Sequence, residues 1–271
     1  MQKPPFNCKE WKTELPEMAE ITKVIQEAKD IKSFFFRFDK EVRPGQFVMI
    51  WIPCVDEKPY AVSYQKGKEM AITSHMIGPF TKALDRLRKG DKIGVRGPYG
   101  KGFTPKKNAC VIGGGVGMAS VSTLIDALGN PTILMGAKDK AHVLYKKRYP
   151  KAMIATDDGS EGFHGFVTDQ FKEQLKKKKF SMVYTCGPEI MMKKIVEICN
   201  EKGIDCEASV ERYMKCGYGI CGNCVIDDQL VCVDGPVFNR EKLNKLNDFG
   251  RFAHLKNGKK VALAEYYGGR A

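Results

Sequence analysis

Four cysteines fall within seventeen residues in the segment KCGYGICGNCVIDDQLVCVDGP at 215–236. Their spacing is C-x4-C-x2-C-x7-C, formed by Cys216, Cys221, Cys224 and Cys232. Thiols this close together indicate disulfides, a zinc ion or an iron–sulfur cluster, and each choice dictates how the segment folds. Glycines at 217, 219 and 222 separate the first three cysteines, and glycine lets a loop wrap closely around a bound group.

The spacing separates these choices only in part. The first three cysteines match plant-type [2Fe–2S] loops, although the last interval is much shorter. A structural zinc site favours two C-x2-C pairs, and only Cys221 and Cys224 form one. The opening segment MQKPPFNCKEWKTELPEM lacks the apolar core of a signal peptide, which predicts a cytoplasmic protein with reduced thiols and disfavours disulfides.

Composition and charge bound the class of protein. The chain has 271 residues, 43% hydrophobic and 28% charged, which is ordinary for a soluble globular protein of two or three domains. No run approaches eighteen apolar residues, so no membrane span is predicted. The net charge is +13, but the densest basic run, at 176–179, follows an amphipathic helical pattern without interleaved aromatics. This favours an acidic protein partner over nucleic acid.

Residues 18 to about 104 predict a small antiparallel β-barrel. Short apolar or alternating runs are punctuated there by glycine and proline, and the first places Phe34, Phe36 and Phe38 on one side. One helix is predicted at 81–90, with Thr81 as its cap.

From about residue 108, apolar strands alternate with helices that are expected to end at Gly129 and Gly203. This pattern is typical of a doubly wound parallel sheet. We therefore predict three domains: the barrel at 1–105, an α/β domain at 106–205, and a small cysteine-containing domain with a basic tail at 206–271.

A glycine turn, GGGVG at 113–117, follows a buried strand and opens a helix. A bare backbone there lets N–H groups approach a pyrophosphate. The dinucleotide fingerprint is incomplete, because Met118 stands where its last glycine is expected and Lys138 where an acidic residue is expected. A tight strand-to-helix turn without a ligand is the alternative interpretation.

A second loop, TCGPE at 185–189, ends another apolar strand. It is predicted to lie beside the glycine turn at the carboxyl edge of the sheet, where Gly187 opens a crevice for a nicotinamide ring next to Cys186. Taken alone, Cys186 is more simply a buried apolar side chain.

Two barrel segments carry further candidates. EKPYAVSY predicts Lys58 and Tyr60 on opposite faces of a strand, and GPFTKAL places Thr81 at a helix start. A cation and a helix N-terminus are what a pyrophosphate needs, and Tyr60 would lie against an aromatic ring. Individually these residues are ordinary.

Together, these parts resemble the ferredoxin-reductase-like flavoproteins and, more narrowly, the electron-transfer subunits of dihydroorotate dehydrogenase B, the NAD-linked iron–sulfur type. The resemblance spans about 18–240 and is most specific in RPGQFVMIW, GDKIGVRGPYGKGF, IGGGVGMAS, ATDDGSEGFHGFVTD and CGYGICGNCVIDDQLVCVDGPVF. It implies an FAD-binding barrel, an NAD-binding α/β domain and a [2Fe–2S] cluster domain. In this flavin context the cluster is preferred to zinc.

The resemblance also implies site residues at matching positions. FAD contacts fall on Lys58, Pro59, Tyr60, Ala61, Thr73, Ser74, His75, Phe80 and Thr81. NAD contacts fall on Gly113, Gly114, Gly115, Val116, Gly117, Cys186, Gly187 and Pro188. The metal ligands are Cys216, Cys221, Cys224 and Cys232. Lys58 and Ala61 replace the family's usual arginine and serine, and lysine lacks the guanidinium fork, so weaker flavin retention is expected.

The same resemblance implies an oxidoreductase subunit without a catalytic acid–base pair. Electrons would pass from a separate FMN-bearing dihydroorotate dehydrogenase subunit through the cluster and FAD to NAD, in pyrimidine biosynthesis. Val237 and Phe238 are predicted at the centre of the contact in that hetero-oligomer; alternatively, they close the core of their own domain. Two other interpretations stay open: a diaphorase-like subunit of a sulfhydrogenase or ferredoxin-dependent transhydrogenase, and a zinc-stabilised basic binding module.

Overall fold

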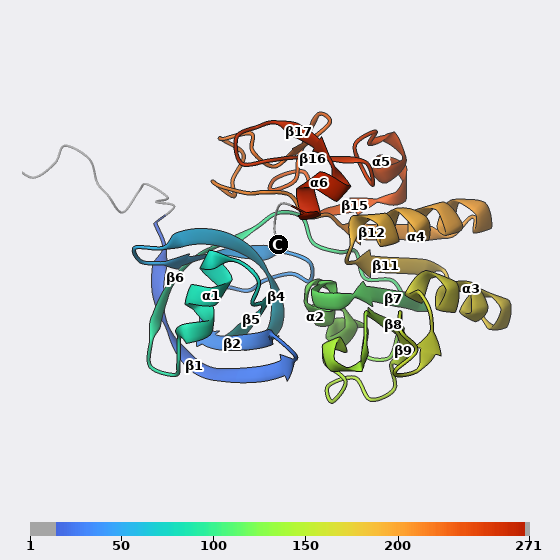
Figure 1. The fold of residues 1–271 in the computed structure, drawn as a ribbon, viewed down its shortest axis with the longest axis horizontal. Coiled ribbons are helices and arrows are strands. Elements are labelled where there is room, and N and C mark those ends of the chain that lie inside the picture. Colours follow the sequence, from blue (N-terminus) through green and yellow to red (C-terminus); the bar gives the residue numbers. More distant parts are fainter. Residues whose placement is uncertain (1–14, 269–271) are drawn as a thin grey trace, which may run out of the picture.

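The computed structural model describes residues 15–268 and begins with a closed antiparallel barrel (Figure 1). Most of the opening segment used to predict a cytoplasmic location lies outside the described residues. The barrel order is β1-β2-β5-β4-β3-β6, with β1 Glu17–Ala28, β2 Ile31–Arg37, β3 Phe47–Ile52, β4 Asp56–Lys66, β5 Glu69–His75 and β6 Lys92–Tyr99. Phe34, Phe36 and Phe38 are all buried in its core, which confirms the predicted alternation.

The helix between the last two barrel strands, α1 (Pro79–Arg86), begins two residues before the predicted start. Gly78 is its N-cap, and Pro79 suits the first helical position, where an N–H has no partner within the helix. Thr81 is therefore not the predicted N-cap but the third helical residue, which takes part in a capping box. Its Oγ1 instead turns back and accepts the N–H groups of Gly78 at 2.8 Å and Ile77 at 3.0 Å.

A seven-stranded sheet follows, in the order β10-β9-β8-β7-β11-β12-β15. Its strands are β7 Ala109–Gly114, β8 Thr132–Ala137, β9 Met153–Thr156, β10 Phe163–His164, β11 Met182–Cys186, β12 Asp205–Ser209 and β15 Val237–Asn239. All neighbouring strands are parallel except β12 and β15. Strand order reverses direction between β7 and β11, as in a doubly wound sheet.

Helices cover both faces of this sheet (Figure 1). α2 (Met118–Leu128) packs on the face that carries Val111 and Tyr184, whereas α3 (Val167–Lys177) and α4 (Glu189–Lys202) pack on the face that carries Cys110 and Val183. α2 and α4 end at Gly129 and Gly203, as predicted, and both glycines have positive φ. Two short 3₁₀ turns, η1 (Gly115–Gly117) and η2 (Lys140–His142), follow β7 and β8.

The last part of the chain lies over the sheet and the barrel (Figure 1). It contains the hairpins β13 (Val225–Ile226) with β14 (Gln229–Leu230) and β16 (Phe252–His254) with β17 (Lys260–Ala262), and the helices α5 (Arg240–Lys245) and α6 (Leu263–Gly268). A small core of Ala253, Val261, Leu263 and Tyr266 closes the second hairpin against α6. The predicted boundary at 205/206 falls at the start of β12, inside the sheet; the three-domain division itself stays a prediction.

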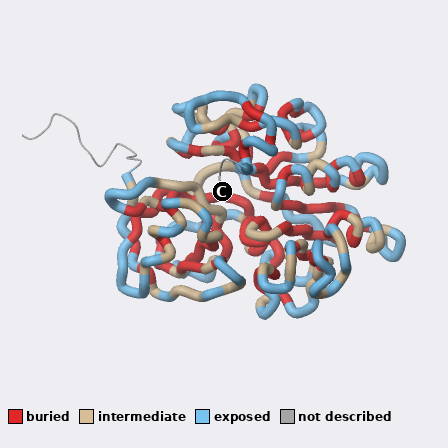
Figure 2. Tube along the Cα trace, viewed as in Figure 1, coloured by how far each residue is buried: buried red, intermediate tan, exposed pale blue. Residues whose placement is uncertain are grey.

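Buried residues follow the strands of the barrel and the sheet, and exposed residues follow the outer turns (Figure 2). Buried hydrogen bonds join the two parts. The Tyr145 hydroxyl lies 2.5 Å from Thr73 Oγ1, and Ser122 Oγ donates to the Ser63 carbonyl at 2.6 Å. The barrel and the sheet are therefore held in a defined relation. Within residues 15–268, no helix has the length and apolar character needed to cross a membrane.

Candidate functional site

The glycine turn and the CGP loop lie side by side, as predicted. Their strands β7 and β11 are neighbours, with Gly113 opposite Cys186. A Cβ on Gly117 would stand 2.5 Å from the Cys186 carbonyl oxygen, so the loops meet more closely than a side chain allows. A Cβ on Gly115 would meet nothing within 4 Å, which leaves the outer side of the turn open. Bare backbone at a helix start fits a dinucleotide pyrophosphate.

Only the backbone of Cys186 borders this edge of the sheet. Its side chain is fully buried, and Sγ donates to the Ser209 carbonyl at 3.4 Å. Burial raises the pKa of this thiol to about 12, so it stays neutral. Pro188 packs against the glycine turn. A Cβ on Gly114 would lie only 2.9 Å from Pro188 Cδ, which shows how close the two loops are at this point.

The flavin candidates on β4 converge on one aromatic ring. Lys58 Nζ is 5.7 Å from the Phe80 ring centroid, and the Tyr60 ring is 6.2 Å from the same ring. The prediction of opposite faces is therefore wrong, because side chains two residues apart on a strand share a face. In this structure Lys58 forms an ion pair with Asp56. A cofactor phosphate would have to compete with the Asp56 carboxylate for the Lys58 ammonium group.

Behind these residues, β5 supplies a row of hydroxyl groups. The Tyr60 hydroxyl and Ser74 Oγ are 2.9 Å apart, and burial raises the pKa of Tyr60 to about 12. Thr73 is already engaged with Ser33 at 2.7 Å, in addition to Tyr145, so it supports the joint between barrel and sheet. Pro59 and Ala61 flank Tyr60 on β4.

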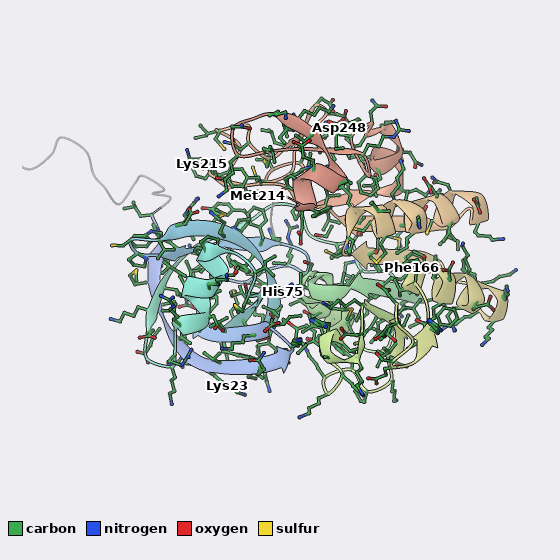
Figure 3. All side chains as sticks on the ribbon, viewed as in Figure 1. Lys23, His75, Phe166, Met214, Lys215 and Asp248 are labelled. Atoms are coloured by element: carbon green, nitrogen blue, oxygen red, sulfur yellow. The ribbon has the colours of Figure 1, made fainter. Side chains whose placement is uncertain are left out.

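His75 lies at the end of β5, between the barrel and the sheet domain (Figure 3). Partial burial lowers the pKa of His75. The neighbouring His142 and Lys138 lower it further, and Asp30 opposes them. Asp139, directly after Lys138, caps the following turn: its Oδ1 accepts the N–H groups of Ala141 at 2.9 Å and His142 at 3.1 Å. Lys138 itself is exposed at the carboxyl end of β8.

The four cysteines of the opening motif stand in two pairs. Cys216 is hydrogen-bonded to Cys221, and Cys224 to Cys232, while all nine described cysteines are free thiols. No group of three or more His, Cys, Asp or Glu side chains in residues 15–268 is arranged to hold one metal ion. In a [2Fe–2S] cluster held by four cysteines, each of the two irons binds two thiolates, so two pairs of thiols suit this cluster.

Backbone N–H groups are aimed at these sulfurs. Those of Cys221, Tyr218 and Ile220 reach Cys216, and that of Cys232 lies 3.4 Å from Cys224 Sγ. Burial raises the pKa of Cys216, but these N–H groups and the Cys221 thiol outweigh it and bring the pKa down to about 7. A thiolate is the form that binds iron, so the loop fits the cluster.

In the second pair, the pKa values of the two thiols shift in opposite directions. The hydrogen bond from Cys232 lowers the pKa of Cys224 to about 7 and, by the same contact, raises the pKa of Cys232. Cys224 and Cys232 are buried, whereas Cys221 is exposed. The first pair therefore forms the outer edge of the site. Gly217, Gly219 and Gly222 all have positive φ, as expected for a loop that wraps a bound group.

Tyr213 is a site residue that sequence reasoning missed. Its ring lies between two lysines, 5.9 Å from Lys58 Nζ and 5.7 Å from Lys256 Nζ. Burial raises the pKa of Tyr213, and its electrostatic interactions with Asp56 and Cys221 add to this. Tyr213 thus connects the candidate flavin site with the cysteine loop. Its only sequence signal is an aromatic residue three positions before Cys216.

A buried ion pair joins the C-terminal unit (residues 210–268) to the CGP loop (residues 185–189). Sequence reasoning also missed this pair. Glu189, the first residue of α4, binds Arg212, and both side chains are 1% exposed. Glu189 Oε1 also accepts the Gly250 N–H at 2.7 Å, and Arg212 Nη2 donates to the Phe252 carbonyl at 3.2 Å. The Glu189 N–H donates to the Tyr267 hydroxyl. Residues 241–268, unexplained by sequence, therefore brace the candidate nucleotide site.

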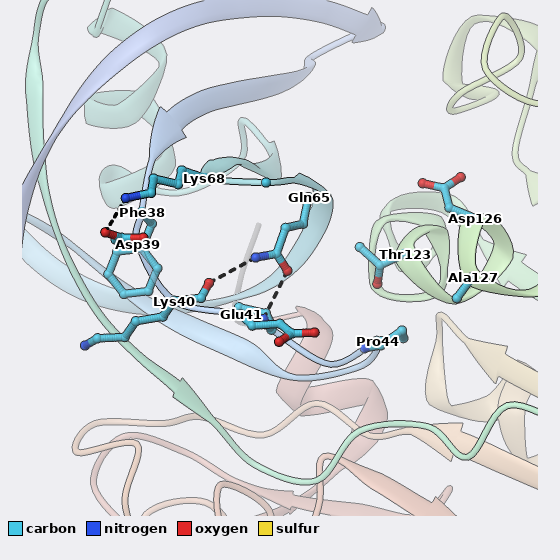
Figure 4. Close-up of a pocket in the computed structure, with 12 residues that line it drawn as sticks. Phe38, Asp39, Lys40, Glu41, Pro44, Gln65, Lys68, Thr123, Asp126 and Ala127 are labelled. Atoms are coloured by element: carbon cyan, nitrogen blue, oxygen red, sulfur yellow. Dashed lines mark hydrogen bonds and ion pairs between the residues drawn. The ribbon is translucent and has the colours of Figure 1, made fainter.

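A cavity of about 580 Å³ lies elsewhere, between the 38–44 loop, the β4–β5 turn and α2 (Figure 4). Gln65 spans it, donating to the Lys40 carbonyl at 3.0 Å and accepting the Val42 N–H at 3.0 Å. None of the predicted cofactor or metal residues lines it. The chemistry of the glycine loops and the thiols, rather than cavity size, therefore defines the candidate site.

Comparisons with known proteins agree with this geometry. Residues 18–103 match the oxidoreductase FAD-binding domain, and residues 211–244 match the iron–sulfur cluster binding domain of dihydroorotate dehydrogenase B. A probable dihydroorotate dehydrogenase B (NAD(+)), electron transfer subunit from Methanocaldococcus jannaschii is 44% identical over 92% of this chain and 99% of that protein. The protein of the same name from Pyrococcus horikoshii is 42% identical over 86% and 93%.

Among solved structures, a chain of the NADH-dependent reduced ferredoxin-NADP oxidoreductase is similar, with a TM-score of 0.76 and 30% identity over 86% of this chain and 92% of that chain. The barrel, the sheet and the cysteine loop thus follow the ferredoxin-reductase-like pattern. The predicted fold class is confirmed, as are the presence of an FAD-binding domain and of an iron–sulfur cluster binding domain. With relatives this similar over nearly their whole length, the chain belongs to the family of electron transfer subunits of dihydroorotate dehydrogenase B.

Proposed function

We propose that this chain carries electrons between a dihydroorotate-oxidising subunit and NAD, through a [2Fe–2S] cluster on Cys216, Cys221, Cys224 and Cys232 and FAD on the barrel. The cluster passes single electrons, NAD takes a hydride, and flavin can do both. The observation that carries the proposal is the pairing of the four thiols on a loop that Tyr213 connects to the Lys58 side of the barrel. The protein's part is to hold these groups in order.

We propose a partner surface other than the one predicted from the sequence. Val237 and Phe238 cannot be its centre, because β15 buries both in the cores around the sheet. The apolar side chains exposed around the cysteine loop are instead Tyr218, Ile220 and Val233, with Ile220 77% exposed. We place the partner's contact on these three, beside the outer thiol pair, where a single electron has the shortest way into the loop.

A second function is favoured by one observation. The similar chain of the NADH-dependent reduced ferredoxin-NADP oxidoreductase shares the barrel, the sheet and most of the chain length. This chain could therefore serve a ferredoxin-linked transhydrogenase with the same internal order of groups. The proposals differ in the partner. Co-purification from the native source decides: an FMN-containing dihydroorotate-oxidising subunit supports the first, and a transhydrogenase subunit overturns it.

Metal and flavin analysis tests the electron route. We expect about two irons and two sulfides per chain. Cys221→Ser should remove the visible cluster bands and leave the flavin in place. Stoichiometric zinc without iron in anaerobically purified protein would contradict the ligand assignment.

The flavin released from the protein should be FAD, because only a pyrophosphate can use both Lys58 and the start of α1. Mass spectrometry of the released cofactor checks this, and FMN alone would contradict it. Ser74→Ala, which removes the partner of the Tyr60 hydroxyl, should weaken flavin retention; Ser181→Ala, at a surface hydroxyl near Asn108, is the matched control.

NAD is proposed over NADP on the strength of the relatives' names. Lys138 is exposed at a position where it could bind the 2′-phosphate of NADP, so its role in nucleotide choice is testable. A preference for NADPH that Lys138→Glu abolishes would reverse this choice. A cytoplasmic location is part of the same proposal, because nine free described thiols suit a reducing compartment.

A further inference from the structure

A buried arginine lies between the barrel and the cysteine loop. Arg96, on β6, is 7% exposed and forms a two-pronged salt bridge with Glu57, with Nε–Oε1 at 2.7 Å and Nη2–Oε2 at 2.5 Å. Nη1 also donates to the Tyr99 hydroxyl at 3.2 Å. Burial lowers the pKa of Arg96, but Glu57 and Tyr99 outweigh burial and raise it, so the guanidinium is charged.

The flat face of this guanidinium supports the loop. Arg96 Cζ is 5.6 Å from the Tyr99 ring centroid and 5.4 Å from that of Tyr218, and the two rings are 6.3 Å apart. Tyr218 belongs to the cysteine loop, and its N–H reaches the Cys216 sulfur. One residue therefore links the arginine to a predicted iron ligand.

The neighbouring glycine shows how closely the loop rests on the barrel. A Cβ on Gly217 would lie 3.1 Å from Met49 Cγ and 3.5 Å from Tyr99 Cδ2. Met49 is fully buried on β3, directly opposite Arg96 in the β3–β6 pairing. Met49, Arg96 and Tyr99 thus form a platform, and this platform belongs to the barrel that carries the flavin candidates.

We propose that the Arg96–Glu57 pair positions the cysteine loop on the barrel and tunes the reduction potential of the cluster bound there. The inference rests on the proposed ligand set. A positive charge one aromatic ring away favours the reduced cluster, which carries the extra electron, and Glu57 opposes part of that effect. Displacing Arg96 also shifts Tyr218, which donates an N–H to a ligand sulfur. Arg96 acts through Tyr218 and is a positioning residue.

The test is an EPR-monitored redox titration of the full chain with its cofactors. Arg96→Gln should lower the cluster potential, and Glu57→Gln should raise it. Each change should alter the equilibrium constant for reduction about threefold to tenfold, or about 28 to 59 mV for one electron. The double variant, neutral at both positions, should return close to the parent. A purely structural role would not produce shifts of opposite sign.

Two further variants complete the test. Arg148→Gln is the matched control: Arg148 is likewise paired with an aspartate, Asp126, and stacked on tyrosines, but at the joint with α2, and it should leave the potential unchanged. Arg96→Lys keeps the charge but loses the two-pronged, stacked geometry, so its potential should shift less than that of Arg96→Gln. This variant also replaces Arg96→Gln in the test if Arg96→Gln does not fold.

Shifts of the same sign in both single variants, or no shift while the EPR signal persists, overturn the inference. A shift in Arg96→Lys as large as in Arg96→Gln overturns the electrostatic part. Absence of a cluster signal from the parent protein counts against the ligand assignment instead, so the two failures are distinguishable.

Discussion

At the scale of single residues, buried charges carry most of the organisation around the site. Arg96 and Arg212 each pair with one glutamate, one under the cysteine loop and one under the CGP loop. A buried charge that loses its partner is strongly unfavourable, because neither water nor a counter-charge then solvates it. These pairs therefore fix where the loops sit, whatever their net contribution to stability.

Glu189→Gln should destabilise the protein by about 3 to 5 kcal/mol, since it leaves Arg212 charged and buried without its partner. Urea denaturation followed by tryptophan fluorescence measures this. Lys245→Gln is the matched control, because its pair with Glu241 is exposed to solvent on α5 and contributes little to stability. Equal losses in both variants would show that Glu189 does not brace the fold.

Glu207 predicts a pH dependence of stability. Burial raises the pKa of its carboxyl above the ordinary 4.5, and the N–H of Thr104, at 2.9 Å, offsets only part of this. The folded chain therefore holds this proton more tightly than the unfolded chain, and stability falls as pH rises from 4.5 through the raised pKa. Glu207→Gln should flatten this fall in thermal melts between pH 4 and 7. An unchanged slope would contradict the assignment.

At the scale of elements, the nucleotide site depends on two loops that meet without side chains. Gly117 sits at the start of α2 against the backbone of Cys186, and Gly187 has a φ of 155° beside Gly114. Because β7 and β11 are adjacent parallel strands, their following loops open at the same edge of the sheet. A change at this junction should affect nucleotide binding before it affects the flavin.

Gly117→Ala should weaken NADH binding roughly tenfold to hundredfold, because its Cβ would push the two loops apart. Flavin absorbance should be retained. Gly203→Ala, at the end of α4, is the control: its φ of 64° makes alanine costly for stability, but it has no neighbour within 4 Å and should leave NADH binding as in the parent. Unaltered NADH binding in Gly117→Ala would rule out this crevice.

At the scale of the whole molecule, the candidate groups follow one another across three packed units. The barrel offers Lys58 and Tyr60, Tyr213 bridges to the cysteine loop, and the sheet brings the two glycine-containing loops to the same side. The net charge of +13 suits an acidic partner, whose approach would weaken with added salt. In the proposed electron route, the partner subunit oxidises dihydroorotate. The isolated chain should therefore reduce artificial dyes with NADH but should not oxidise dihydroorotate.

Ile220→Glu should weaken association with the partner subunit at least tenfold, because it places a charge at the centre of an apolar contact. The cluster EPR signal should confirm that the loop is still loaded. Phe166→Glu, at the start of α3 (Figure 3), is an exposed apolar control and should bind the partner normally. Equal affinity of both variants would place the interface elsewhere.

The sequence alone determined the features that depend on local pattern. The alternation of Phe34, Phe36 and Phe38, the glycine ends of α2 and α4, and the cysteine spacing all act through neighbours in the chain, and the resemblance they supported is confirmed by relatives. The positions of the ligand and cofactor residues remain predictions, although their grouping agrees with them.

Tertiary structure alone decided which distant residues meet. Val237 and Phe238 became core because β15 pairs with β12, and Lys58 meets the rings of Phe80 and Tyr213, which come from separate segments. Arg96 under Tyr218 joins residues more than a hundred positions apart. No local periodicity encodes such contacts, because they form only when packing of the barrel, the sheet and the C-terminal unit removes these groups from water.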